Sequence, residues 1–164
     1  CSSDLLVLST LHTNDAPSSL SRLHDLGVQP FLTSATILGV MAQRLLRTLC
    51  PHCKQSVTVL ADSEIAIQWQ ELVQPWRAPL PTQVYTANGC EQCRHTGYQG
   101  RMGLYEIMPL SNELKKLVAA DANLDTLKQQ AYREGLQPLR LSGAKRISEG
   151  VTSIEEVMRV VPLS

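Results

Sequence analysis

The chain has 164 residues, 43% of them hydrophobic and 18% charged, and its 15 basic residues balance 15 acidic ones. This composition is that of a soluble globular protein with enough apolar residues for one good core or two small ones. Balanced charge excludes a general electrostatic footprint for nucleic acid or an anionic membrane, and no apolar stretch reaches the length of a transmembrane span.

Residues 5–8 form a continuous apolar run, which predicts a fully buried strand of the parallel type. A polar loop follows, and Asn14 or Asp15 is placed to cap a helix with Pro17 in its first turn and Gly27 at its end. Open α/β sheets bind anionic ligands where a strand, a loop and a helix N-terminus meet in this way. The opening residues are too short for a signal peptide, which favours the reducing cytosol.

A second helix is predicted from Pro30 to Met41. Residues 43–50 are expected to form a strand, with a continuation of that helix as the alternative. Residues 64–73 predict a short amphipathic helix, and residues 100–108 return to an extended pattern. The middle of the chain is therefore expected to be mixed α/β.

The remainder is predicted to be helical. Ser111 is placed to cap a helix over residues 112–120, and two further helices over residues 124–134 and 139–149 each stop at a glycine. Thr152 and Glu155 have the spacing of a capping box that opens a last helix. A small helical subdomain is expected to close the chain.

The strongest chemical signal is a pair of C-x-x-C motifs, formed by Cys50 with Cys53 and by Cys90 with Cys93. Four thiolates are the ligand set of a closed tetrahedral zinc site, which holds structure and leaves no position open for chemistry. The alternatives are two redox dithiols or chance pairs in a reduced core. Cys1 is the odd thiol, and a chain that begins there is expected to be a piece of something longer.

The surroundings of the cysteine pairs support the zinc interpretation. Gly97 follows the second pair, where the backbone must fold back toward sulfur. The basic residues Arg47, Lys54, Arg94 and Arg101 lie close in sequence and would offset the negative charge of a four-thiolate site. The segment between the pairs is longer than the roughly 15 to 20 residues of a compact ribbon, which implies a small insertion.

The loop around His12 is the candidate chemical site. A lone histidine is more often structural, but a loop that faces a helix N-terminus favours ligand contact, and Thr10, Thr13 and Asn14 are placed to share in hydrogen bonding. Arg101 has two readings that the residues leave open. Its guanidinium either counters the charge of the zinc site or lies against a ligand ring or phosphate.

Several catalytic motifs are absent from the 164 residues. The sequence contains no G-x-x-x-x-G-K-[ST] phosphate loop and no G-x-G-x-x-G, G-x-S-x-G or H-E-x-x-H motif. Without a phosphate loop the chain has no usual means of holding a triphosphate. Autonomous catalysis is therefore not expected.

The motifs described so far occur together in one known order. The string LSTLHTNDA at residues 8–16, the segment from Ala42 to Cys53 and the G-R-M-G-L-Y-E string at residues 100–106 are followed by Gly-Val-Thr at residues 150–152. In order and spacing they resemble the secretion ATPases of bacterial type II secretion and type IV pilus assembly. The resemblance covers nearly the whole chain and is weakest over residues 56–85.

The resemblance implies an α/β fold, namely the C-terminal portion of a RecA-like P-loop ATPase core, a tetracysteine zinc-knuckle insertion and a small helical C-terminal subdomain. The three parts would span residues 1–49, 50–108 and 109–164. The parent would be a homo-hexamer, cytoplasmic and peripheral on the inner membrane. It would use ATP and Mg²⁺ to act on a membrane platform protein and other secretion or pilus proteins, with no nucleic acid as partner.

The resemblance also implies roles for single residues. His12 would be the catalytic histidine of the family's His box, which senses or positions the terminal phosphate region, and Thr10, Thr13 and Asn14 would complete that motif. Arg101 falls in the G-R-x-G-x-Y-E motif, whose arginine lies near the nucleotide base. The four cysteines match the zinc site that retraction ATPases of the same superfamily lack, which favours an assembly or secretion branch.

The chain departs from the family in one respect. The Walker A loop, the Asp box and the Walker B motif precede the His box in the family and are missing here, so we expect this chain alone to be inactive. The alternative function is a free-standing zinc-stabilised module that binds a protein partner without nucleotide chemistry. A zinc ribbon that binds nucleic acid is a weaker third option, because the charge is neutral and aromatic residues are few.

Overall fold

The computed structural model describes residues 5–162, and Cys1 lies outside them. The chain forms two compact units: unit 1 contains residues 5–40 and Met108–Gly135, and unit 2 contains Met41–Ile107 and residues 136–162. Each unit is built from two stretches of sequence, so the units cut across the three consecutive segments expected above. The three consecutive segments remain a prediction.

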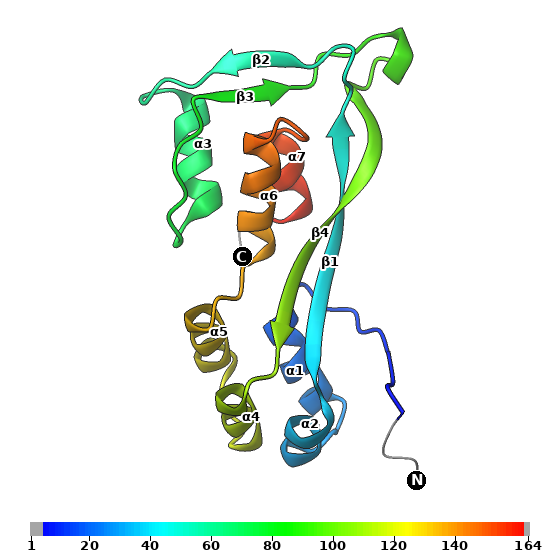
Figure 1. Ribbon diagram of the computed structural model, residues 1–164, viewed down its shortest axis with the longest axis vertical. Helices are drawn as coiled ribbons and strands as arrows, with labels where there is room; N and C mark the ends of the chain where they lie inside the picture. The colour runs from blue at the N-terminus through cyan, green and yellow to red at the C-terminus, as the bar shows by residue number, and fades with distance from the viewer. Residues whose placement is uncertain (1–4, 163–164) are drawn as a thin grey trace. The chain divides into compact units, whose positions relative to one another are not determined.

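Unit 1 is made of four helices, α1 (Ala16–Asp25), α2 (Pro30–Thr36), α4 (Asn112–Ala119) and α5 (Leu124–Arg133). Helix α1 packs on α5, and α2 packs on α4 (Figure 1). Fully buried aliphatic side chains from three of these helices fill the core between them: Leu20, Leu114, Val118 and Leu127. Helices α4 and α5 confirm the two predictions made from the sequence for this stretch.

Helix α1 begins where the sequence predicts. Asp15 is its N-cap, and the carboxylate accepts a hydrogen bond from the backbone N–H of Ser18 at 2.7 Å. Lys128 of α5 lies 3.0 Å from the other carboxylate oxygen. Gly27 follows the helix with φ of +87°, a left-handed conformation that glycine adopts without strain.

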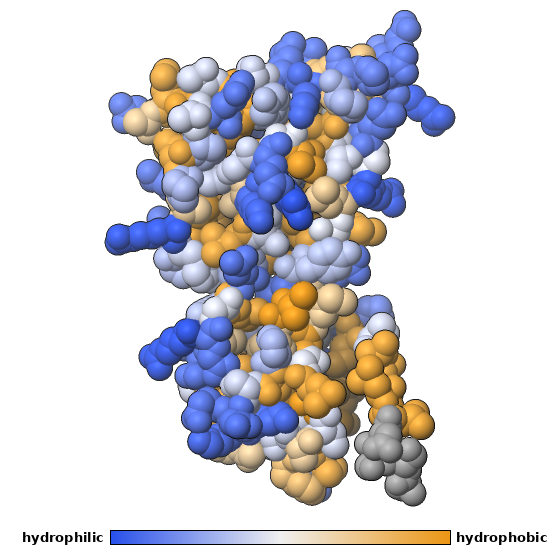
Figure 2. All heavy atoms as spheres, in the orientation of Figure 1, coloured by the Kyte–Doolittle hydropathy of each residue, from blue (hydrophilic) through white to orange (hydrophobic). Residues whose placement is uncertain are grey.

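The strand predicted at residues 5–8 is wrong for this chain. These residues form no strand in the described range and are exposed, with Leu8 at 87%. A buried parallel strand needs neighbouring strands, and both two-stranded sheets in the described residues are formed by later segments, between residues 39 and 109. Apolar side chains are visible among the hydrophilic ones on the surface in Figure 2.

The predicted second helix is too long. Helix α2 ends at Thr36, and β1 spans Gly39–Leu49, so the strand expected from residue 43 is confirmed but starts earlier. The carbonyl of Leu38 already accepts a hydrogen bond from the N–H of Leu110 at 2.9 Å. The apolar spacing here fits either structure, and pairing with a distant strand decides it.

Most of the long antiparallel ribbon of β1 with β4 (Tyr98–Pro109) belongs to unit 2, and β4 confirms the predicted extended segment (Figure 1). Helix α3 (Glu64–Val73) forms as predicted. A second antiparallel pair, β2 (Gln55–Thr58) with β3 (Gln83–Thr86), was not predicted. Helix α6 (Leu139–Ser148) contacts α3, β3 and α7 (Ile154–Val160).

The last helix begins one residue later than the sequence predicts. Ser153, and not Thr152, is the N-cap of α7, and its hydroxyl accepts the N–H of Glu156 at 3.3 Å. The Thr152 hydroxyl instead donates to the carbonyl of Arg47 at 2.9 Å. The cap of α7 thus lies one residue beyond the predicted position, and Thr152 contacts β1. In residues 5–162, no helix combines the length and hydropathy that crossing a bilayer requires.

Candidate functional site

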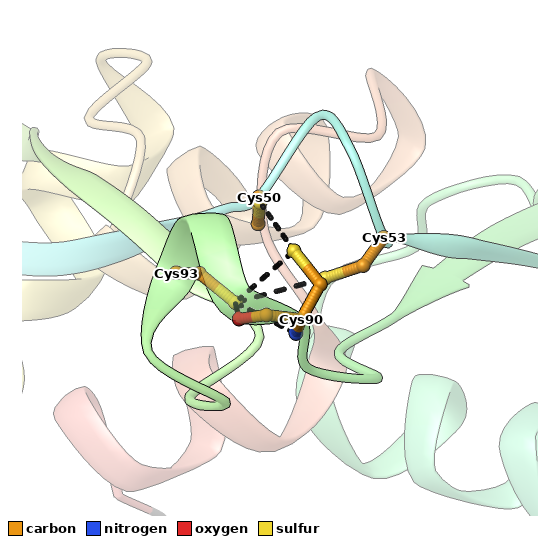
Figure 3. Close-up of side chains that lie close together, drawn as sticks. All are labelled: Cys50, Cys53, Cys90 and Cys93. Carbon is orange, nitrogen blue, oxygen red and sulfur yellow. Dashed lines mark hydrogen bonds between the residues drawn. The ribbon is translucent and has the colours of Figure 1, made fainter.

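The four cysteines of the two C-x-x-C motifs meet in unit 2. Cys50 and Cys53 lie in the turn that follows β1. Cys90 is the N-cap of the short 3-10 helix η1 (Glu91–Cys93), and Cys93 is its last residue. Their sulfur atoms all lie within 4.8 Å of one another. The separations are 3.9 Å for Cys50 and Cys90, and 3.8 Å both for Cys53 and Cys93 and for Cys90 and Cys93 (Figure 3). Four side chains placed in this way are able to hold one metal ion.

Backbone N–H groups point at the sulfur atoms. The N–H of Gly89 donates to Cys53 Sγ at 3.3 Å, and those of Cys90 and Gly97 each donate to Cys93 Sγ at 3.2 Å. Burial opposes ionisation of Cys93, but these two donors outweigh it and lower the pKa of the Cys93 thiol to about 6. These backbone donors therefore favour the ionised form of Cys93, which is the form that binds a metal ion.

The pKa of Cys53 is shifted in the opposite direction. Burial raises the pKa of Cys53 to about 12, and the three neighbouring thiols add to the effect. Four sulfurs this close cannot all ionise unless a cation takes up their charge. A bound metal ion would supply that cation, because a coordinating thiol loses its proton.

Two glycines shape the second turn around the sulfurs. Gly89 has φ of +106° and Gly97 has φ of +76°. A Cβ atom at Gly89 would lie 2.8 Å from the carbonyl oxygen of His95, and one at Gly97 would lie 2.6 Å from Ala87 Cβ. A backbone bend was predicted from the sequence at Gly97 but not at Gly89. A glycine directly before a C-x-x-C pair could have indicated the second bend.

Two of the basic residues expected to offset the site's charge also have partners elsewhere. Arg47 binds the carboxylate of Glu156 on α7, and Lys54 donates to the carbonyl of Gly150. Arg101 is exposed on β4 and belongs to unit 2, as do the cysteines. The two readings of Arg101 both stay predictions.

The predicted nucleotide-site residues lie just before α1 in unit 1. His12, Thr10 and Asn14 are exposed, and Thr13 is half-buried with its Oγ1 atom 2.7 Å from the hydroxyl of Ser19. The structure thus fixes Thr13 against the first turns of α1. These four residues and Arg101 belong to different compact units, and their roles as ligands of a nucleotide remain predictions.

Comparison with known proteins gives one family and several relatives. The family described as "Type II/IV secretion system protein" matches residues 3–159. The type IV pilus assembly ATPase TfpB of Acinetobacter baylyi is 62% identical over 159 residues, which is 97% of this chain. The type IV pilus assembly ATPase PilB of Myxococcus xanthus is 42% identical over 93% of the chain, and the type II secretion system ATPase E of Vibrio cholerae is 41% identical over 94%.

These relatives are much longer than the chain. The matched region makes up 26% of the Acinetobacter and Myxococcus proteins and 29% of the Vibrio protein. The chain therefore spans about a quarter of the length of the curated relatives it matches.

Proposed function

Because this chain belongs to the type II/IV secretion system protein family, we propose that it is the C-terminal part of an ATP-hydrolysing motor for type IV pilus assembly or type II secretion. The observation that carries the proposal is the 62% identity with a pilus assembly ATPase over 97% of the chain. Identity to the type II secretion ATPase is lower, at 41%, so type IV pilus assembly is the better supported of the two processes.

We propose that the parent protein binds ATP and Mg²⁺ and works as a homo-hexamer at the cytoplasmic face of the inner membrane, where it acts on platform proteins. In this arrangement His12 would contact the terminal phosphate region, with Thr10, Thr13 and Asn14 beside it. Their shared position in the loop directly before α1 supports this role, because loops next to the ends of helices often carry ligand-contacting groups. Arg101 would lie near the nucleotide base.

We propose zinc as the metal of the four-cysteine site. A tetrahedral zinc ion with bonds of about 2.3 Å holds its sulfur ligands about 3.8 Å apart. The closest sulfur pairs lie 3.8 to 3.9 Å apart, which fits this geometry. Because all four positions are taken by protein, the ion would stabilise the fold and would not take part in ATP hydrolysis.

Metal analysis tests the site. We expect about one zinc per chain in protein purified without chelator, because four thiolates complete one coordination sphere. Cys90→Ser should lower that content and loosen the fold of unit 2, since a structural zinc contributes directly to folding free energy. A fully reduced chain with almost no zinc would refute the assignment.

A chimera tests the motor function. The chain would replace the matching segment of the Acinetobacter baylyi relative, and we expect the purified chimera to hydrolyse ATP and to restore pili in the bacterium. His12→Ala in the chimera should lower turnover by roughly ten-fold or more while nucleotide binding changes less. His52→Ala, which alters another exposed histidine, is the matched control.

The isolated chain should be inactive under either function, and the chimera separates the two. It lacks a phosphate loop, so we expect no ATP hydrolysis by it, and turnover that survives His12→Ala and rigorous purification would contradict this. A chimera that folds and binds nucleotide but neither hydrolyses ATP nor restores pili would count against the motor. That outcome would favour a zinc-stabilised module that binds a protein partner.

A further inference from the structure

The turn before α7 is held by the end of β1. The backbone N–H of Leu49 donates to the carbonyl of Val151 at 2.8 Å. The hydroxyl of the fully buried Thr152 donates to the carbonyl of Arg47 at 2.9 Å. Residues 150–153, called the docking turn below, therefore extend the hydrogen bonding of β1 at the point where the strand reaches Cys50.

The other side of the first cysteine pair holds the same turn. Lys54 Nζ donates to the carbonyl of Gly150 at 2.8 Å and lies 4.6 Å from the centre of the Tyr85 ring. Leu49 directly precedes Cys50, and Lys54 directly follows Cys53. The first cysteine pair is thus bracketed by two residues that bind the docking turn.

The second cysteine pair reaches the turn as well. The N–H of Cys50 donates to the carbonyl of Gly97 at 2.9 Å, which ties the two cysteine turns together. The next residue, Tyr98, has its hydroxyl 2.8 Å from that of Ser153, the N-cap of α7. Both turns that carry the sulfur atoms therefore have a direct hydrogen-bonded connection to the docking turn.

The buried carboxylate of Glu156 joins α7 to the end of β1. Glu156 has no exposed side-chain surface, and it accepts hydrogen bonds from the backbone N–H, Nε and Nη2 of Arg47. Arg159, on the same helix, supplies the remaining ion pair. If the end of β1 moves, Glu156 loses its backbone donor and one of two guanidinium groups while it stays buried, which is costly.

We propose that metal binding at the four cysteines controls whether the docking turn and α7 stay fixed on β1. Metal binding holds Cys50 and Cys53 in place and so orders Leu49 and Lys54, whose donors fix the turn. Metal loss releases these donors and loosens residues 149–160, so the C-terminal helix responds to the metal. The inference rests on the proposed metal site but not on the motor function.

Hydrogen exchange of the whole chain, with zinc and after chelation, tests the proposal. We expect faster exchange after chelation in residues 39–54 and 149–160, with little change in α4 and α5, which share none of these contacts. If metal is lost and hydrogen exchange in residues 149–160 does not change, the coupling is refuted but the metal site is not. Equal acceleration throughout the chain would also overturn it, because the response would not be selective. Failure to bind zinc at all would refute the metal site.

The thermodynamic linkage between zinc binding and docking of the turn gives a second test, which uses conservative variants. If the metal favours the docked turn, weakening the docking must weaken zinc binding by the same factor. Thr152→Val and Tyr98→Phe each remove one docking hydroxyl without changing charge. We expect each to weaken zinc affinity about three- to ten-fold in competition with a chromophoric chelator.

Matched controls remove hydroxyls that play no part in docking. Thr126→Val removes an exposed hydroxyl that bonds to Asn123 at the start of α5, and Tyr105→Phe removes an exposed phenol on β4. Both controls should bind zinc like the parent chain. Affinities of the docking variants equal to those of the controls would overturn the proposal.

Discussion

Gly97 and Gly27 share a left-handed backbone but differ in what surrounds them. Their φ angles are +76° and +87°, so alanine at either position is strained by roughly 1 kcal/mol. A Cβ at Gly97 would lie 2.6 Å from Ala87 Cβ, whereas nothing lies within 4 Å of one at Gly27. We expect Gly97→Ala to cost clearly more stability than Gly27→Ala and to lower the zinc content. Urea denaturation and metal analysis check this, and equal losses in the two variants would contradict it.

At the scale of single residues, the sequence carries most of the metal site. The spacing of Cys50, Cys53, Cys90 and Cys93 predicts the cluster, because a C-x-x-C turn brings its own two sulfurs together locally. The donors from Gly89 and Gly97 were not predicted, since an N–H···S contact depends on how the turns meet. The expected role of His12 rests on a resemblance and on its loop position.

Helix α7 depends on the buried carboxylate of Glu156. Burial alone would raise the pKa of Glu156, but hydrogen bonds from Arg159 and Arg47 outweigh it and lower the pKa from 4.5 to about 2. The ionised form is therefore favoured in the folded chain. Its contribution is complete above pH 4.5 and is lost as the pH falls toward 2.

Glu156→Gln tests this element. We expect the substitution to lower the free energy of unfolding by about 2 kcal/mol at pH 7, because charge-assisted hydrogen bonds are lost. The difference from the parent chain should shrink as the pH falls from 5 to 2. Glu155→Gln, at the exposed neighbouring position, removes the same charge and controls for metal loss in acid. A difference that stays constant with pH would contradict the prediction.

At the scale of elements, local sequence patterns predict a helix correctly where its structure depends on its own residues. Capping residues and glycine stops predict α1, α4, α5 and α6, and an amphipathic pattern predicts α3, each within a residue or two of its observed ends. The predictions fail where contact with a distant segment determines the local structure. Pairing with β4 makes residues 39–41 part of a strand and not of a helix, and Thr152 donates to the Arg47 carbonyl and does not cap α7.

Residues 5–8 expose apolar side chains, which bears on the behaviour of the whole molecule in solution. Leu6 and Leu8 are 70% and 87% exposed in an extended segment, and contiguous apolar surface of this kind promotes association. We expect Leu6→Ser with Leu8→Ser to reduce self-association of the isolated chain, as measured by light scattering at increasing concentration. Leu60→Ser, at a leucine that is 69% exposed in unit 2, is the control and should have less effect. A parent chain that stays monomeric throughout would refute the expectation.

Most of the helices, the cysteine cluster and the family could be predicted from the residues alone, because they depend on local spacing and on motifs that occur in order along the chain. The two discontinuous units, the pairing of β2 with β3 and the exposure of residues 5–8 appear only in the folded chain. The tertiary structure alone joined the turn before α7 to both cysteine turns. Contacts between residues a hundred positions apart, such as Arg47 with Glu156, leave no local pattern, since each partner is chosen by the packing of the whole unit.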